Sequence, residues 1–130
     1  MLEQRNIGAV DSAEALALVA EDIQQLQEFA RLEADWNSYG AKPTAQTAIT
    51  VATDLLKQVA RIARVRPDFV APLANGGVQL EWADGAAEIA IRVYPNQTLA
   101  YLRTEGNRHT EKDDVPLSEV VNLVAQTLSR

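Results

Sequence analysis

The sequence has no cysteine, a single histidine and few aromatic residues. Without cysteine the chain has no disulfide framework, no thiolate metal ligand and no cysteine nucleophile. The single histidine, His109, lies in a polar stretch, and one histidine without cysteine partners is a poor basis for a transition-metal site. We therefore predict no metal and no cofactor.

Long hydrophobic runs and catalytic motifs are also missing. No apolar stretch approaches the ~20 residues that cross a bilayer, and residues 1–5 lack the basic and apolar regions of a signal peptide. No serine stands in a G-x-S-x-G context, and Gly76-Gly77 is not followed by the Lys-Ser/Thr of a phosphate-binding loop. The sequence predicts a cytoplasmic, bacterial-type protein that is not an enzyme and has no catalytic residues.

Positive charge is scarce, since 12 basic residues face 18 acidic ones and the net charge is -6. This balance makes nucleic acid an unlikely partner. A basic strip is nevertheless present near the end of the second predicted helix, formed by Lys57, Arg61, Arg64 and Arg66. These residues complement the helix dipole or lie against acidic residues of the first helix. A phosphate-binding strip is the alternative, and with it a nucleic-acid-associated function.

The rest of the chain is organised around residues 76–94, which predict a β-hairpin. Asp84-Gly85 suits a two-residue type I′ turn. Counting outward from that turn places Trp82 opposite Ala87, Leu80 opposite Ile89 and Val78 opposite Ile91, so that one face is apolar. The opposite face would carry Gln79, Glu81, Glu88, Ala90 and Arg92.

This register places Glu81 directly opposite Glu88. Opposed like charges destabilise a sheet unless water screens them. The pair is either a solvated feature or a carboxylate pair that awaits a cation, a partner's arginine or a proton. The second reading gives a further alternative function, a metal or carboxylate-site protein.

Three helices are predicted from apolar spacing and capping residues. The first runs from Asp11 or Ser12 to near Asp35, the second from the N-cap Thr44 to about Ala63, and the third starts at 113–116. Their predicted buried positions are Leu16, Val19, Ile23, Leu26 and Ala30; Ala48, Ala52, Leu55, Leu56, Val59, Ile62 and Ala63; and Leu117, Val120, Val121, Val124 and Leu128.

Two further strands flank the hairpin. Residues 69–73 contain Pro72, which cannot donate a ladder hydrogen bond, so they should form an edge strand. A three-residue turn at 95–97 would place Gln97 where glycine is usual and set Leu99 and Tyr101 on the core side. Residues 108–112 are compatible with a short fifth strand.

The predicted fold is α+β: two N-terminal helices, an antiparallel meander of about four strands and a C-terminal helix, in one domain (12–130) after a flexible arm (1–11).

Residues 36–43 form a predicted loop that holds two aromatic side chains. Gly40 is the expected site of positive φ. We expect Trp36 to close the end of the core near Trp82. An exposed recognition surface that includes Asn37 is the alternative, and the role of Tyr39 is open.

Two segments of the chain together resemble signatures of an uncharacterised family of small bacterial proteins. They are Asp35-Trp36-Asn37-Ser38-Tyr39-Gly40-Ala41-Lys42-Pro43 and Gly76-Gly77-Val78-Gln79-Leu80-Glu81-Trp82. The family joins a W-x-S-Y-G-A-x-P loop to a G-G-V-Q-L-E-W strand, and the resemblance spans about Leu32 to Leu102. It implies no activity. It draws attention to Trp36, Tyr39, Gln79, Glu81 and Trp82.

The sequence therefore predicts a small non-enzymatic protein-interaction module, of the antitoxin- or inhibitor-like, effector-chaperone-like or phage-defence-accessory kind. Its partner would be another protein, and an open sheet face also suits a homodimer. The predicted partner-binding residues are Trp36, Asn37, Tyr39, Gln79, Glu81, Glu88 and Arg92.

Overall fold

The computed structural model describes residues 13–128, so the predicted arm at 1–11 lies outside the described residues. Within this range the strands form one antiparallel sheet whose order follows the chain, β1-β2-β3-β4-β5. The strands are β1 (Phe69–Pro72), β2 (Val78–Asp84), β3 (Ala87–Val93), β4 (Leu99–Glu105) and β5 (Arg108–Val115). The helices are α2 (Ala20–Phe29), α3 (Gln46–Ala63) and α4 (Leu117–Leu128), and residues 13–18 are also helical.

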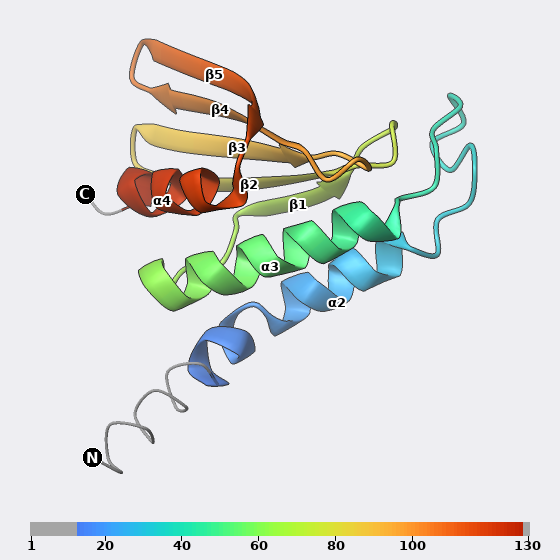
Figure 1. The fold of residues 1–130 in the computed structure, drawn as a ribbon, viewed down its shortest axis with the longest axis horizontal. Coiled ribbons are helices and arrows are strands. Elements are labelled where there is room, and N and C mark those ends of the chain that lie inside the picture. The colour runs from blue at the N-terminus through green and yellow to red at the C-terminus, as the bar shows by residue number, and fades with distance from the viewer. Residues whose placement is uncertain (1–12, 129–130) are drawn as a thin grey trace.

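The molecule has two layers, with the helices on one side of the sheet (Figure 1). α4 packs across β2, β3 and β4, α3 packs on β2, β3 and α4, and α2 packs on α3 and β1. The predicted α+β class is therefore confirmed. The meander has five strands rather than about four, because residues 108–115 add a full edge strand.

The central hairpin has the predicted faces but not the predicted register. Its turn is Gly85-Ala86, one residue later than expected, so Leu80 pairs with Ile91 and Trp82 with Ile89. Gly85 takes φ +62 at the first turn position, which suits a type II′ turn rather than type I′. The partner of each β2 residue therefore moves by two positions, which keeps every apolar side chain on the same face.

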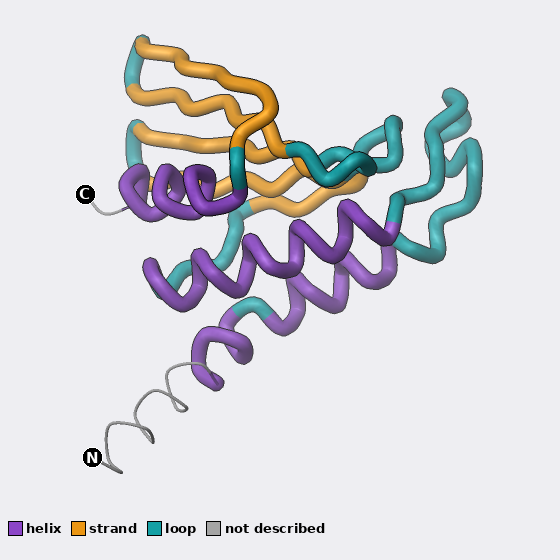
Figure 2. The backbone as a smooth tube through the Cα atoms, in the orientation of Figure 1, coloured by secondary structure: helices purple, strands orange, loops and turns teal. Residues whose placement is uncertain are grey.

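The first predicted helix is interrupted and ends early. Val19 leaves the helical region (φ -107, ψ 12) and separates residues 13–18 from α2, a break that Figure 2 shows as a short loop-coloured segment. α2 ends at Phe29, six residues before the predicted Asp35. Leu16, at 43%, and Ala30 are both exposed, so these two predicted core positions are wrong.

α3 agrees more closely with its predicted range but not with its predicted cap. The N-cap is Ala45, no side chain caps the helix, and the buried Thr44 hydroxyl has no hydrogen-bond partner. Ile62 is 57% exposed, because the buried stripe runs instead through Ile49 and Ala60.

The turn between β3 and β4 has the predicted three-residue form, whereas the last helix starts later than expected. Gln97 has φ +72, and Leu99 and Tyr101 pair with Val93 and Ile91. Residues 113–115 belong to β5, and α4 begins after Pro116, whose carbonyl accepts from the amides of its first turn.

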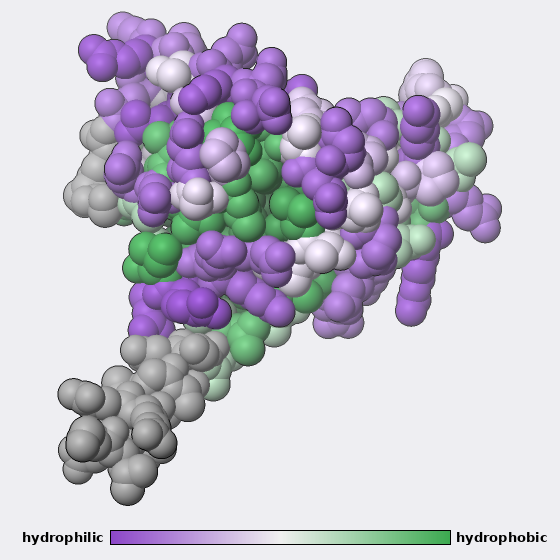
Figure 3. All heavy atoms as spheres, viewed as in Figure 1, coloured by the Kyte–Doolittle hydropathy of each residue, from purple (hydrophilic) through white to green (hydrophobic). Residues whose placement is uncertain are grey.

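The core lies between the helices and the apolar face of β2 and β3. Its largest fully buried side chains include Trp82, Leu55, Leu56, Leu80 and Ile89. On the face seen in Figure 3, apolar residues gather in the middle, between the polar residues of the upper strands and those of the helices below. Across residues 13–128, none of the helices has the length and apolar character needed to cross a membrane.

Gly77 is required where β2 begins, because a Cβ atom there would lie closer to the Val93 carbonyl oxygen than real Cβ atoms approach. Gly77→Ala should therefore lower the free energy of unfolding by about 2 kcal/mol or more, measured by chemical denaturation. Gly106→Ala is the control, since a Cβ atom added at Gly106 would meet no other atom and only the φ of +60 there disfavours alanine. This substitution should lower the free energy of unfolding by about 1 kcal/mol. Equal losses in both variants would contradict the close approach at Gly77.

Candidate functional site

The sheet face opposite the helices, here called the outer face, is uncovered by any element of residues 13–128. Cross-strand pairing arranges it in rows. One row runs Phe69, Glu81, Ala90, Leu102 and Glu111, and the next runs Ala71, Gln79, Arg92 and Ala100. Two large apolar side chains are open on this face, Phe69 at 49% and Leu102 at 43% exposure.

A chain of hydrogen bonds fixes the polar side chains of the outer face. Arg92 Nε donates to Gln79 Oε1 at 3.1 Å, and Gln79 Nε2 donates to Glu81 Oε2 at 2.6 Å. The amide of Gln79 thus separates the guanidinium from the carboxylate and orients both. Three predicted site residues are brought together here.

Glu88 lies on the same face but outside this chain. It is paired with Ala83 and Thr104, while Glu81 is paired with Ala90, so the predicted opposition of Glu81 and Glu88 is wrong. The cause is the two-residue change in hairpin register. No group of three or more potential metal ligands occurs among the residues that the structure describes.

A hollow of about 170 Å³ opens on the outer face. Its floor is built from alanines, which leave room between longer side chains. We call it the outer-face hollow; its lining residues are Gln79, Ala90, Arg92, Tyr94, Ala100, Tyr101, Leu102, Glu111 and Asp113.

The second part of the candidate site is residues 35–42, here called the Tyr39 loop. Its backbone is tied to its own side chains: Asn37 Oδ1 accepts from the amides of Tyr39 (2.8 Å) and Ala41 (3.1 Å). Asp35 Oδ1 accepts from the Gly40 amide at 2.7 Å, and the Asp35 amide donates to the Ala41 carbonyl. These bonds hold the loop in one shape.

The loop keeps this shape against local backbone preference. Asp35 (φ 65), Ser38 (φ 66) and Gly40 (φ 84) are all left-handed, and for a residue other than glycine this conformation costs roughly 1–2 kcal/mol. Such strain persists only where surrounding contacts determine the conformation, and it is concentrated at functional sites.

Trp36 closes the base of the loop instead of the core. It is half-buried, and its Nε1 donates to the Lys42 carbonyl at 2.8 Å. The predicted contact with Trp82 is wrong, because the loop bonds to the turn before β2 whereas Trp82 lies near the far end of that strand.

Tyr39, at the tip of the loop, is 91% exposed, more than any other large apolar residue of the described chain. The loop is anchored through Lys42 N, which donates to the Ala74 carbonyl (2.8 Å), and just after the loop Ala45 N donates to the Gly76 carbonyl (2.9 Å). Gln79, which lines the outer-face hollow, follows three residues after Gly76. The Tyr39 loop and the hollow therefore lie at the same end of the sheet.

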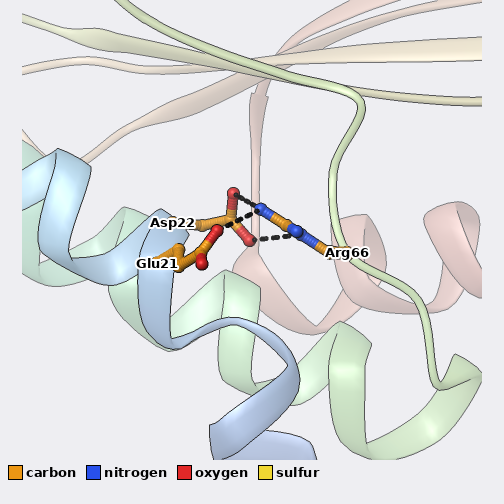
Figure 4. A network of polar contacts seen from close by, with 3 residues as sticks. All are labelled: Glu21, Asp22 and Arg66. Carbon is orange, nitrogen blue, oxygen red and sulfur yellow. Dashed lines mark hydrogen bonds and ion pairs between the residues drawn. The ribbon is translucent and has the colours of Figure 1, made fainter.

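The basic strip is partly occupied by acidic residues of the first helical segments. Arg66 makes a two-pronged contact with the buried carboxylate of Asp22, with both nitrogen–oxygen distances 3.2 Å, and lies 3.6 Å from Glu21 (Figure 4). Hydrogen bonding to Asp22 raises the pKa of Arg66 above its ordinary value. Arg64 lies 3.7 Å from Glu14, so the predicted contact with the acidic helix is confirmed for two arginines.

The other two basic residues, Lys57 and Arg61, line a shallow hollow on α3 together with Asp54. The four predicted basic side chains are therefore divided between a pairing role and an open helix surface. Two of the four side chains of the predicted phosphate-binding strip thus contact carboxylates of the same chain.

Sequence reasoning missed Asp22, Tyr94, Leu102 and the hollow itself. Asp22 had a signal, since it lies between Val19 and Leu26 at helical spacing, and an acid within an apolar stripe indicates a buried ion pair. The hollow had no signal in the sequence, because it depends on how neighbouring strands pair.

No family model, curated protein or solved structure matches this chain. The candidate site therefore rests on the geometry of the chain alone.

The side chain of Asn37 should hold the Tyr39 loop in its shape. Asn37→Ala removes the acceptor for two amides and should speed hydrogen exchange at Tyr39 and Ala41, with a stability loss of about 1 kcal/mol. Exchange at β3 amides should be unchanged, which serves as the internal control. Unchanged exchange in the loop itself would show that the carboxamide does not organise it.

Proposed function

We propose that this protein is a non-enzymatic protein-interaction module whose binding surface joins the Tyr39 loop to the outer face. The observation that carries the proposal is a tyrosine 91% exposed on a loop that its own side chains hold in place. Tyrosine is enriched among the residues that contribute most to protein interfaces. A loop already fixed in shape loses little conformational entropy on binding.

The outer face supplies the remainder of such a surface. Apolar Phe69 and Leu102 lie among the polar side chains Gln79, Glu81 and Arg92, which are already oriented by one another. A mixture of apolar anchors and positioned hydrogen-bonding groups is typical of interfaces that form and separate. Glu88 adds charge at the margin, where it would influence association rate more than affinity.

The partner in this proposal is another protein, held in an antitoxin- or inhibitor-like, chaperone-like or phage-defence-accessory role in the cytoplasm. A nucleic-acid partner is the weaker candidate, because Arg64 and Arg66 contact carboxylates of the same chain. The surface proposed here does not include that helix face.

The proposal is tested by affinity capture from the native cell with matched variants. Tyr39→Ala and Leu102→Asp should each reduce recovery of a stoichiometric partner by at least about tenfold, as expected for central interface residues. Quantitative mass spectrometry measures the recovery.

Ile62→Asp is the matched control. Ile62 is exposed on the helical layer, so the substitution introduces the same charge as Leu102→Asp but away from the proposed surface. It should leave recovery unchanged, and all three variants should keep their cooperative thermal transitions. A partner that Ile62→Asp loses and the other two variants retain would place the binding surface on the helices and refute the proposal.

A further inference from the structure

We infer that Tyr39 of one copy docks into the outer-face hollow of a second copy, so that the free protein is a reciprocal dimer. The inference rests on the proposed function in that it gives the same surface an occupant when no other partner is bound. Tyr39 does not line the hollow of its own chain, and its side chain is 91% exposed. Both halves of the contact are therefore available in each copy.

The size of the hollow fits one aromatic ring. It encloses about 170 Å³, and a cavity of roughly 150 Å³ in another protein binds benzene. Its floor includes Ala90 and Ala100, and Leu102 forms an apolar wall that is 43% exposed. Docking would bury this wall together with the tyrosine ring.

The chemistry of the walls fits a tyrosine in particular. The hydrogen bond from Arg92 Nε to Gln79 fixes the orientation of the guanidinium, and therefore the direction of its outer edge. Among the described residues no carboxylate forms an ion pair with Arg92 within 4.0 Å. A guanidinium in such a place can bind a ring face or donate to a phenolic oxygen.

The charges around the two surfaces are complementary. Glu111 and Asp113 give the hollow an acidic rim, while Lys42 is exposed at the base of the Tyr39 loop. A tyrosine that enters the hollow brings a lysine of its own loop toward two carboxylates. The pairing would favour encounter and orientation of the copies.

The position of the two surfaces permits both contacts at once. The Tyr39 loop and the hollow lie at the same end of the sheet, so one two-fold rotation can place each loop against the other copy's hollow, which closes the assembly at two copies. Pairing through the β5 edge is disfavoured, since Arg108–Asp114 are all exposed and mostly charged, the usual protection of an edge strand.

The experiment measures the mass of the purified chain by light scattering and sedimentation. The wild-type chain should be a dimer. Tyr39→Ala removes the ring, and Ala90→Phe fills the hollow with a residue that suits a strand; each variant alone should weaken self-association at least tenfold. An equimolar mixture of the two should form a one-to-one complex, because one intact ring then meets one open hollow.

Two control variants keep the outcome specific. Tyr39→Phe retains the ring and should remain dimeric, and Ala71→Phe makes the same substitution as Ala90→Phe on the same face but outside the hollow. Circular dichroism melts check that each variant is folded. Should Ala90→Phe unfold, Leu102→Asp replaces it as the hollow variant.

A monomeric wild-type chain, or a dimer that survives both Tyr39→Ala and Ala90→Phe, would overturn the inference. Neither result decides the proposed function, which is tested by partner recovery in the native cell. Loss of dimer without loss of partner, or the reverse, would separate the two.

Discussion

The structure depends on one constraint, the burial of a single face of the central hairpin. From Val78 to Trp82 on β2 and from Ala87 to Val93 on β3, every second side chain is apolar and buried. Because neighbouring strands must present the same face, β1 and β4 are oriented by this pair, and the helices α2, α3 and α4 have one apolar surface on which to pack. The polar outer face follows from the same alternation and is left to the solvent or to a partner.

The Tyr39 loop is a second, local constraint attached to the first. It connects α2 to α3, and it is fastened to the turn that leads into β2. The close approach of Gly77 to β3 fixes that turn. The exposed tyrosine therefore has a defined position relative to the outer face, although it lies on a connection between two helices. Strain at Asp35 and Ser38 is tolerated because side-chain acceptors within the loop compensate for it.

Much of this architecture could be predicted from alternation and spacing, and the failures have physical causes. The faces of the hairpin were predictable, but its register was not, since a glycine can take either position of a two-residue turn and Gly85 takes the first. The helix break at Val19 and the exposure of Ile62 depend on packing that a periodic pattern does not contain. Tyr39 and Asn37 were recognisable as unusual loop residues, whereas the hollow arises from alanines placed side by side by strand pairing.

The order of the strands has a consequence for how the chain forms during synthesis. Each strand pairs only with its neighbour in the sequence, so the sheet can grow one hairpin at a time, and contacts of this local kind are associated with fast folding. The helices α2 and α3, however, leave the ribosome before β2 and β3 exist. Their apolar stripes have no sheet to cover until the central hairpin is made, so the nascent chain passes through a stage in which it exposes its future core.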